Sequence, residues 1–240
     1  ELFLSSNVDL ELEPEALLRA VETAMADDLD VACWEFRQKP FEHPKHYDPI
    51  SLETTWASAA CLLLRTAALR AVGGFEPRIF LYGEDVELSY RLRDHGYRLR
   101  YLPRAACWHH AYERPEQVKP LQFLGAVYAG VALRMRYADK SEIRAGWLSL
   151  LKLLFDKAVP VSRRELCSVA WRLLRDARYY GATRATGGAN FPFNGFDYEI
   201  ARAGGFHACP AVGLATPKVS LIMRTAGCTA EIVREMLLSV

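Results

Sequence analysis

The feature that most constrains the fold is an alternation of strand and helix patterns over the first hundred residues. An apolar run at residues 2–4 precedes a helical pattern that starts at Pro14, and a second apolar run follows at residues 31–34. Strand, helix and strand in this order are typical of a layered α/β fold. The apolar spacing in the helix predicts one buried face, formed by Leu17, Leu18, Val21, Ala24 and Met25.

The same alternation continues downstream. An apolar run at residues 59–64 leads into a short helix that ends at Gly73 and Gly74, and a second helix runs from residue 84 to residue 95 and stops at Gly96. Glycine ends helices readily because it adopts the left-handed conformation. Residues 97–102 alternate as a strand, which we expect Pro103 to close. Residues 37–55 are polar and predict an irregular loop.

A helical region follows from about residue 116. Its periodicity predicts one helix buried on most sides, a second at residues 145–158 and a third at residues 163–180. The third has an apolar stripe, and its other face carries Arg163, Arg164, Arg172, Arg175 and Arg178. That face is either the solvated side of a packed helix or a surface for an anionic membrane.

Composition excludes several classes of protein. The chain has 240 residues, of which 51% are apolar, so it has enough material for a core. Thirty basic and 29 acidic residues give a net charge of +1, which provides no general attraction to nucleic acid. The longest apolar run, residues 121–133, is too short to span a bilayer. Six scattered cysteines without a C-x-x-C pair favour a reducing, cytoplasmic setting.

Polar residues at two predicted strand ends are candidates for a metal site. Asn7 and Asp9 follow the first strand, and His109 and His110 follow residues 105–107. Ligands of open α/β sheets gather beyond the carboxyl ends of strands, and an aspartate with a histidine can hold a divalent ion together with diphosphate oxygens. Alternatively, Asp9 is a turn former or helix cap, and the histidines belong to the core or the surface.

An acidic pair begins the predicted helix at residue 84. Glu84 and Asp85 are favoured there by the helix dipole alone, although a carboxylate at a helix mouth can also take a proton from an alcohol. In the polar loop, the spacing of His43 and His46 suggests zinc, but no cysteine lies nearby and prolines interrupt the segment. We interpret residues 37–47 as a substrate-contacting loop.

The order of these motifs resembles a known family. Residues 56–65, 72–75 and 80–93, followed by Gly96, Tyr97 and Pro103, are similar to bacterial family 2 glycosyltransferases. The resemblance covers residues 1–115 and is most specific at 56–110. It implies a GT-A (Rossmann-like) nucleotide-sugar transferase domain of the α/β class, and an inverting reaction that transfers a hexosyl or deoxyhexosyl group from a nucleotide sugar.

The resemblance also implies roles for single residues. Asp9 stands at the metal position of the family's D-x-D motif, where it and Asn7 would contact the donor diphosphate, and Asn7 replaces the first aspartate of that motif. His109 matches a histidine that ligates the metal, Mn2+ or Mg2+, in some members. Asp85 matches the catalytic base, with Glu84 beside it.

Acceptor contacts follow from the same resemblance. Trp56, Ser58 and Glu84 are the predicted acceptor-binding residues. The acceptor would be a glycan or a lipid-linked sugar, and the process would be synthesis of a bacterial surface polysaccharide such as O-antigen or capsule. The alternative is a non-catalytic, glycosyltransferase-like scaffold module.

The resemblance predicts four segments. Residues 1–115 would form the C-terminal half of a GT-A domain, 116–180 a helical extension and 181–217 a linker. Residues 218–240 would be the first strand and helix of a second glycosyltransferase-like domain, which implies a tandem parent protein. The nucleotide-recognising half would precede residue 1, so we expect the isolated chain to be inactive. We expect the protein in the cytoplasm, at the inner face of the plasma membrane if the arginine face binds lipid.

Overall fold

The computed structural model describes residues 1–40, 42, 45, 47–48, 50–110, 119–187, 191 and 193. The chain divides into two compact units, Glu1–Ala208 and Cys209–Val240. The second unit, with the predicted strand and helix of residues 218–240, lies outside the described residues, as does most of the predicted linker. The proposed division into four segments therefore stays a prediction.

A five-stranded mixed sheet forms the centre of the first unit. Its strands are β1 (Leu2–Ser6), β2 (Leu10–Leu12), β3 (Val31–Lys39), β4 (Cys61–Arg65) and β5 (Arg98–His109). They lie in the order β1-β4-β3-β5-β2, with β3 and β5 parallel and all other neighbours antiparallel. This sheet confirms the predicted α/β class.

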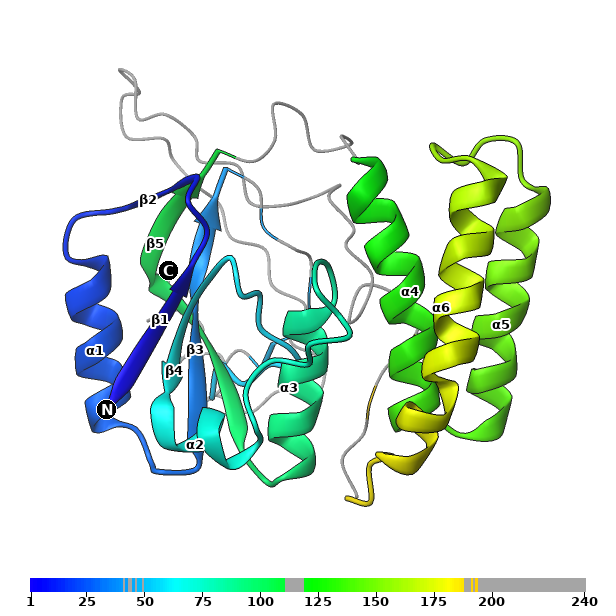
Figure 1. Ribbon diagram of the computed structural model, residues 1–240. Helices are drawn as coiled ribbons and strands as arrows, with labels where there is room; N and C mark the ends of the chain where they lie inside the picture. Colours follow the sequence, from blue (N-terminus) through cyan, green and yellow to red (C-terminus); the bar gives the residue numbers. More distant parts are fainter. Residues whose placement is uncertain are drawn as a thin grey trace, which may run out of the picture. The chain divides into compact units, whose positions relative to one another are not determined.

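Helices cover both faces of the sheet (Figure 1). Helix α1 (Ala16–Ala26) packs on one face, and helices α2 (Thr66–Ala71) and α3 (Glu84–Asp94) pack on the other. Strand β4 divides its side chains between the two cores, because successive residues of a strand point to opposite faces. Cys61 and Leu63 join the core under α1, whereas Leu62 and Leu64 join the core under α2 and α3.

The predicted buried face of α1 is correct for Ala24, which is buried, and for Val21, which packs against the same core, but wrong for its three larger residues. The residues that lie against the sheet are three alanines in steps of four, each at most 1% exposed: Ala16, Ala20 and Ala24. The expected core residues Leu17, Leu18 and Met25 are 41%, 56% and 75% exposed. Small side chains let the helix approach the sheet closely, which turns the larger residues outward.

Strand β5 also differs from the prediction, since it continues through Pro103 to His109. The partners of β3 change from Leu102 at Phe36 to Ala106 at Arg37, so residues 103–105 form a bulge. Proline cannot donate a hydrogen bond to a strand neighbour, and a bulge removes it from the ladder. Pairing then resumes and carries His109 to the end of the sheet. Strand β3 likewise extends to Lys39, into the predicted loop.

Three further helices follow, as predicted: α4 (Pro120–Tyr137), α5 (Lys140–Phe155) and α6 (Arg163–Ala182). They share a core with α3, in which Val86 and Tyr90 of α3 meet Tyr128 of α4 and Leu173 of α6. Figure 1 shows α4 between α3 and the other two helices. Among the residues that the structure describes, no helix combines the length and the apolarity needed to cross a membrane.

Candidate active site

Two predicted metal ligands meet at one end of the sheet. Strand β2 pairs with β5 so that Leu10 lies opposite His109, and the His110 N–H donates to the carbonyl of Asp9 at 3.0 Å. This register brings Nε2 of His109 to 3.5 Å from Oδ1 of Asp9. His110 points to a different carboxylate, with Nε2 3.7 Å from Oε2 of Glu11. Asp9 and His109 are therefore the pair that the backbone brings together.

The His109 ring is held in one orientation by a residue that the sequence did not single out. Gln38, at the end of β3 and 3% exposed, accepts a hydrogen bond from Nδ1 of His109 through Oε1 at 2.9 Å. Nε2 then carries the lone pair, 3.4 Å from Nδ2 of Asn7. Histidines that ligate metals almost always donate from the other ring nitrogen in this way. The arrangement directs Nε2 toward the Asp9 carboxylate.

The donor chemistry of this pair fits Mn2+ or Mg2+. A carboxylate oxygen suits both ions, and an imidazole suits transition metals, which favours Mn2+. Mg2+ in enzymes is commonly held by one or two protein carboxylates, while substrate phosphates complete the shell. Within the described ranges no group of three or more His, Cys, Asp and Glu residues could hold an ion. A two-ligand set of Asp9 and His109 therefore suits an ion that arrives with a diphosphate.

The acidic pair lies in the first turn of α3, after Gly83 in the left-handed conformation (φ 102°). The Asp85 carboxylate accepts the Val86 N–H at 2.8 Å and the Ala59 N–H at 3.3 Å. Burial raises the pKa of Asp85, and these N–H groups and the Lys45 charge oppose the increase. Burial, together with the Asp85 charge, raises the pKa of Glu84 to about 8.

One short segment connects the two clusters. The carbonyl of Ala60 accepts the Asn7 N–H at 2.9 Å, and the carbonyl of Ala59 accepts the Ser5 hydroxyl at 3.2 Å. The N–H of Ala59 is the group that holds Asp85. The end of β1, which precedes Asp9, and the start of α3 are thus attached to the same two residues.

Two of the three predicted acceptor contacts are buried. Trp56 is 1% exposed in the core shared with the helices, and Ser58 is 2% exposed and accepts the Ala60 N–H at 3.3 Å. These side chains shape the segment beneath Asp85, and Glu84 is the predicted acceptor residue that keeps exposed surface. Direct contact of Trp56 or Ser58 with an acceptor has no support in this geometry and stays a prediction.

The polar loop is anchored to the sheet by a buried ion pair. Lys45 lies with Nζ 2.5 Å and 2.6 Å from the two carboxylate oxygens of Glu35 and 3.9 Å from the Trp56 ring centroid. Both charged side chains are at most 6% exposed. Burial raises the pKa of Glu35, and the Lys45 ammonium opposes it. Part of the predicted substrate loop is thus structural, while His43 and His46 lie outside the described residues.

Comparison with known proteins gives the family of this region. Residues 14–123 match the model of the family described as "Glycosyltransferase like family 2". The N-acetylglucosaminyl-diphospho-decaprenol L-rhamnosyltransferase of Mycobacterium tuberculosis is 43% identical over 63 residues, which cover 26% of this chain and 20% of that protein. The pre-mycofactocin glycosyltransferase of the same species is 36% identical over 89 residues, covering 36% of this chain and 18% of that protein.

Among solved structures, the mannosyltransferase PcManGT from Pyrobaculum calidifontis, in complex with GDP-Man and Mn2+, aligns with 76% of this chain and 59% of its own, at 14% identity and a TM-score of 0.41. The chain spans about a fifth of the length of the curated relatives that it matches. The prediction made from residues 56–103 is confirmed, and the segment from residue 14 to residue 123 belongs to glycosyltransferase-like family 2.

Proposed function

We propose that the protein is an inverting glycosyltransferase, which transfers a sugar from a nucleotide-sugar donor to a hydroxyl group of a glycan or lipid-linked acceptor. The family assignment of residues 14–123 supports this activity. The observation that carries the proposal is the attachment of two clusters to the Ala59–Ala60 segment. One cluster offers Asp9 and His109 for a metal diphosphate, and the other offers Asp85 as a base.

Asp85 would act on the acceptor. An alcohol is a weak nucleophile, and a carboxylate that removes its proton as the new bond forms lowers the barrier. Burial raises the pKa of Asp85, which strengthens it as a base once it is ionised. The acceptor oxygen would bond to the anomeric carbon while the bond to the diphosphate breaks, and the proton would pass to Asp85. Attack opposite the leaving group inverts the configuration without a covalent intermediate.

Asp9 and His109 would act on the donor. They would hold Mn2+ or Mg2+, with Asn7 beside the diphosphate and Gln38 fixing the His109 ring. A divalent ion supplies positive charge that stabilises the departing nucleoside diphosphate. Asp9 and His109 would place that charge at the end of the sheet nearest the Ala59–Ala60 segment.

A lipid-linked acceptor is supported by one relative, whose name contains a diphospho-decaprenol. By this analogy we propose a role in bacterial surface polysaccharide synthesis, at the inner face of the plasma membrane. Helix α6 offers a fitting surface, since Trp171 and Leu174 are 70% and 59% exposed on its arginine-bearing face. Binding to anionic vesicles that is weaker at high salt than at low salt would support this location. Equal binding at low and high salt would contradict an electrostatic attraction between the arginine-bearing face and the lipid.

The alternative function is a scaffold without catalysis, joined to a second glycosyltransferase domain in a tandem protein. The Asn7 position, where the family motif has aspartate, favours this alternative. Retention of Asp9, His109 and Asp85 together favours the enzyme. The two functions differ in whether the full-length protein transfers sugar and in whether that transfer requires Asp85.

The decisive experiment combines binding and turnover. We expect Mn2+ to bind this chain more tightly when a nucleoside diphosphate is present, and to lose affinity in Asp9→Ala and His109→Ala. Glu11→Ala, two residues after Asp9 and on β2, is the matched control and should bind normally. In the full-length protein we expect Asp85→Asn to reduce transfer by at least about a hundredfold. Wild-type turnover in Asp85→Asn would refute the assignment of the base.

A further inference from the structure

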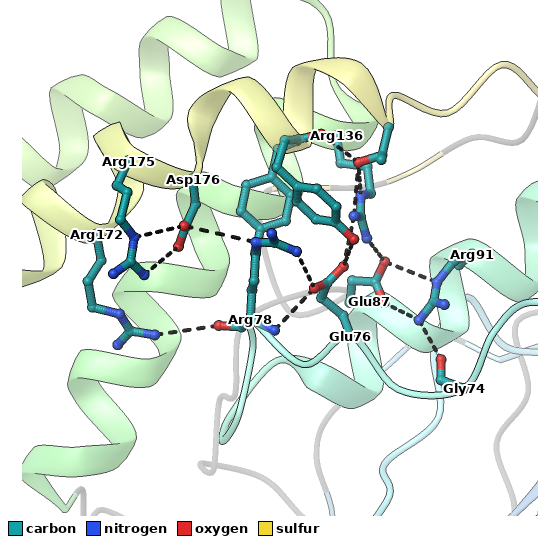
Figure 2. Close-up of polar contacts among 12 residues, drawn as sticks. Gly74, Glu76, Arg78, Glu87, Arg91, Arg136, Arg172, Arg175 and Asp176 are labelled. Atoms are coloured by element: carbon teal, nitrogen blue, oxygen red, sulfur yellow. Dashed lines mark hydrogen bonds and ion pairs between the residues drawn. The ribbon is translucent and has the colours of Figure 1, made fainter.

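A buried charge network connects the helical region to the acidic helix (Figure 2). Arg136 of α4 is 5% exposed, and its guanidinium contacts two carboxylates. Nη1 bonds to Oε1 of Glu87 on α3, and Nη2 donates to Oε2 of Glu76 at 2.8 Å. Both glutamates are at most 3% exposed. One planar side chain therefore fixes two buried anions at once, an arrangement that a lysine ammonium cannot reproduce.

The two anchors of Arg136 lie on either side of the candidate base. Glu76 is in the segment that leads to α3, and Glu87 comes two residues after Asp85. Further bonds hold the same carboxylates. The Tyr179 hydroxyl donates to Glu76 at 2.8 Å, and the Tyr137 hydroxyl donates to Glu87 at 2.9 Å. The path of residues 76–87 is thus fixed at both ends by the helical region.

Helix α4 also packs directly on the backbone that precedes Glu84. A Cβ atom on Gly83 would lie 2.4 Å from Cβ of Ala129, and one on Gly125 would lie 2.4 Å from the carbonyl oxygen of Leu81. Tyr82 and Gly83 both have left-handed φ values, 65° and 102°. A non-glycine residue in that conformation is held there by its surroundings. The surface of α4 therefore determines how the chain enters α3.

Neither glutamate belongs to the chemistry itself. Both face the helical core, and their charges are matched by Arg136 and, for Glu87, by Arg91 through Oε2 at 2.7 Å. Buried ion pairs often contribute little net stability compared with apolar residues of the same size, because desolvation offsets the attraction. Their directional bonds can instead select one geometry. The natural consequence here is a fixed position for the first turn of α3.

We propose that Arg136 is a positioning residue of the glycosyl transfer reaction, which holds Asp85 in place by anchoring Glu87 and Glu76. The helices that follow the family 2 segment are then part of the catalytic unit. This inference rests on the proposed function, because it assigns Arg136 a role only if Asp85 is the base. It does not involve the metal-binding end of the sheet.

The test is Arg136→Lys in the full-length protein, with Arg144→Lys as the matched control. Arg144 is on α5 with an exposed side chain, away from the charge network of Figure 2. We expect Arg136→Lys to lower kcat by about 10- to 100-fold, since small displacements of a reacting group cost that much, and to leave the donor KM and Mn2+ affinity unchanged. Arg144→Lys should behave as wild type in all three measurements.

Other results would overturn the inference. Wild-type kcat in Arg136→Lys would exclude a positioning role while leaving the proposed function intact. A parallel loss of kcat, Mn2+ affinity and thermal stability would assign Arg136 to general stability. If even the wild-type protein transferred no sugar under conditions in which it binds Mn2+ and diphosphate, the proposed function would fail, and the role of Arg136 with it.

Discussion

Replacing Gly125 of α4 by alanine measures how tightly this helix lies against the segment before Glu84. In an open helix the change would stabilise the protein by up to about 1 kcal/mol, because glycine is the weaker helix former. Here the new Cβ would lie 2.4 Å from the Leu81 carbonyl oxygen and 3.1 Å from Cβ of Tyr82. Favourable carbon contacts lie at roughly 3.5–4.0 Å.

The carbonyl oxygen belongs to the backbone and cannot rotate away, so the helix or the segment must move. Overpacking of this kind typically costs about 1–3 kcal/mol, and so short a contact belongs at the upper end. Subtracting the gain in helix propensity leaves a net loss of about 1–2 kcal/mol for Gly125→Ala. The displacement falls on Leu81 and Tyr82, so we also expect a lower transfer rate.

Two other glycines provide matched controls. A Cβ on Gly181 of α6 meets nothing within 4 Å, so Gly181→Ala should stabilise the protein by about 0.5–1 kcal/mol. A Cβ on Gly146 of α5 would lie 2.8 Å from Cδ of Arg134, a flexible side chain, and Gly146→Ala should fall between the other two.

The assay is urea unfolding followed by tryptophan fluorescence, which reports on the buried Trp34 and Trp56. At equal m values, the free energies of unfolding of Gly125→Ala and Gly181→Ala should differ by about 1.5–3 kcal/mol. If Gly125→Ala is as stable as Gly181→Ala, then α4 does not lie against Leu81 and Tyr82, and packing by α4 does not fix the entry of the chain into α3.

Three further predictions concern single groups. Burial raises the pKa of Glu84 from 4.5 to about 8, so between these pH values the folded chain keeps a proton that the unfolded chain loses, and stability falls as the pH rises. Glu84→Gln should flatten this decline in urea midpoints measured from pH 5 to pH 8. Parallel pH profiles of the variant and the wild type would contradict it. Lys45→Met leaves the Glu35 carboxylate buried without its ammonium and should cost about 3–5 kcal/mol in urea unfolding, most of it recovered in Lys45→Met/Glu35→Gln; an additive double variant would exclude the coupling. Gln38→Leu should weaken Mn2+ binding about 10- to 100-fold by releasing the His109 ring, as a metal titration can establish; unchanged affinity would remove Gln38 from the site.

Features encoded by local patterns could be predicted from the sequence. The α/β class, the glycine stops at Gly73 and Gly96 and the three helices after residue 119 follow from periodicity and backbone preference within a few residues. Asp9 and His109, a hundred residues apart, could be grouped as candidate ligands from their places after predicted strands, and the resemblance selected them over Asn7 and His110. Their meeting depends on the β2–β5 register, which the sequence does not state.

Features that depend on tertiary contacts could not be predicted. Proline ends a strand in most contexts, so the bulge at Pro103 becomes evident only when β3 supplies partners on both sides of it. Gln38 resembled a loop residue because the pairing that makes it part of β3 comes from β5. The buried face of α1 was misjudged because hydrophobicity ranks Leu18 above Ala20, whereas close packing on the sheet favours alanine.

In the first turn of α3, the sequence alone does not distinguish carboxylates with a structural role from carboxylates that can take part in chemistry. Three carboxylates lie there, and the helix dipole favours all of them equally. Glu87 is fully buried and bonded to Arg136, Arg91 and Tyr137, so its charge is neutralised and its role is structural. Asp85 is bonded by backbone N–H groups, and Oε2 of Glu84 is buried without a hydrogen-bond partner among the described residues.

The two kinds of carboxylate differ in whether arginines are bonded to them, and this gives them different chemistry. A buried carboxylate that lacks a bound cation has a raised pKa and a higher affinity for a proton. The pKa values of Glu84 and Asp85 are both raised. If Asp85 is the base, then Glu87→Gln should reduce transfer by displacing α3. Asp85→Asn should reduce transfer by removing the proton acceptor, and it should leave α3 in place. Equal hydrogen-exchange protection of α3 in Asp85→Asn and wild type, with loss of protection in Glu87→Gln, would separate the chemical carboxylate from the structural one.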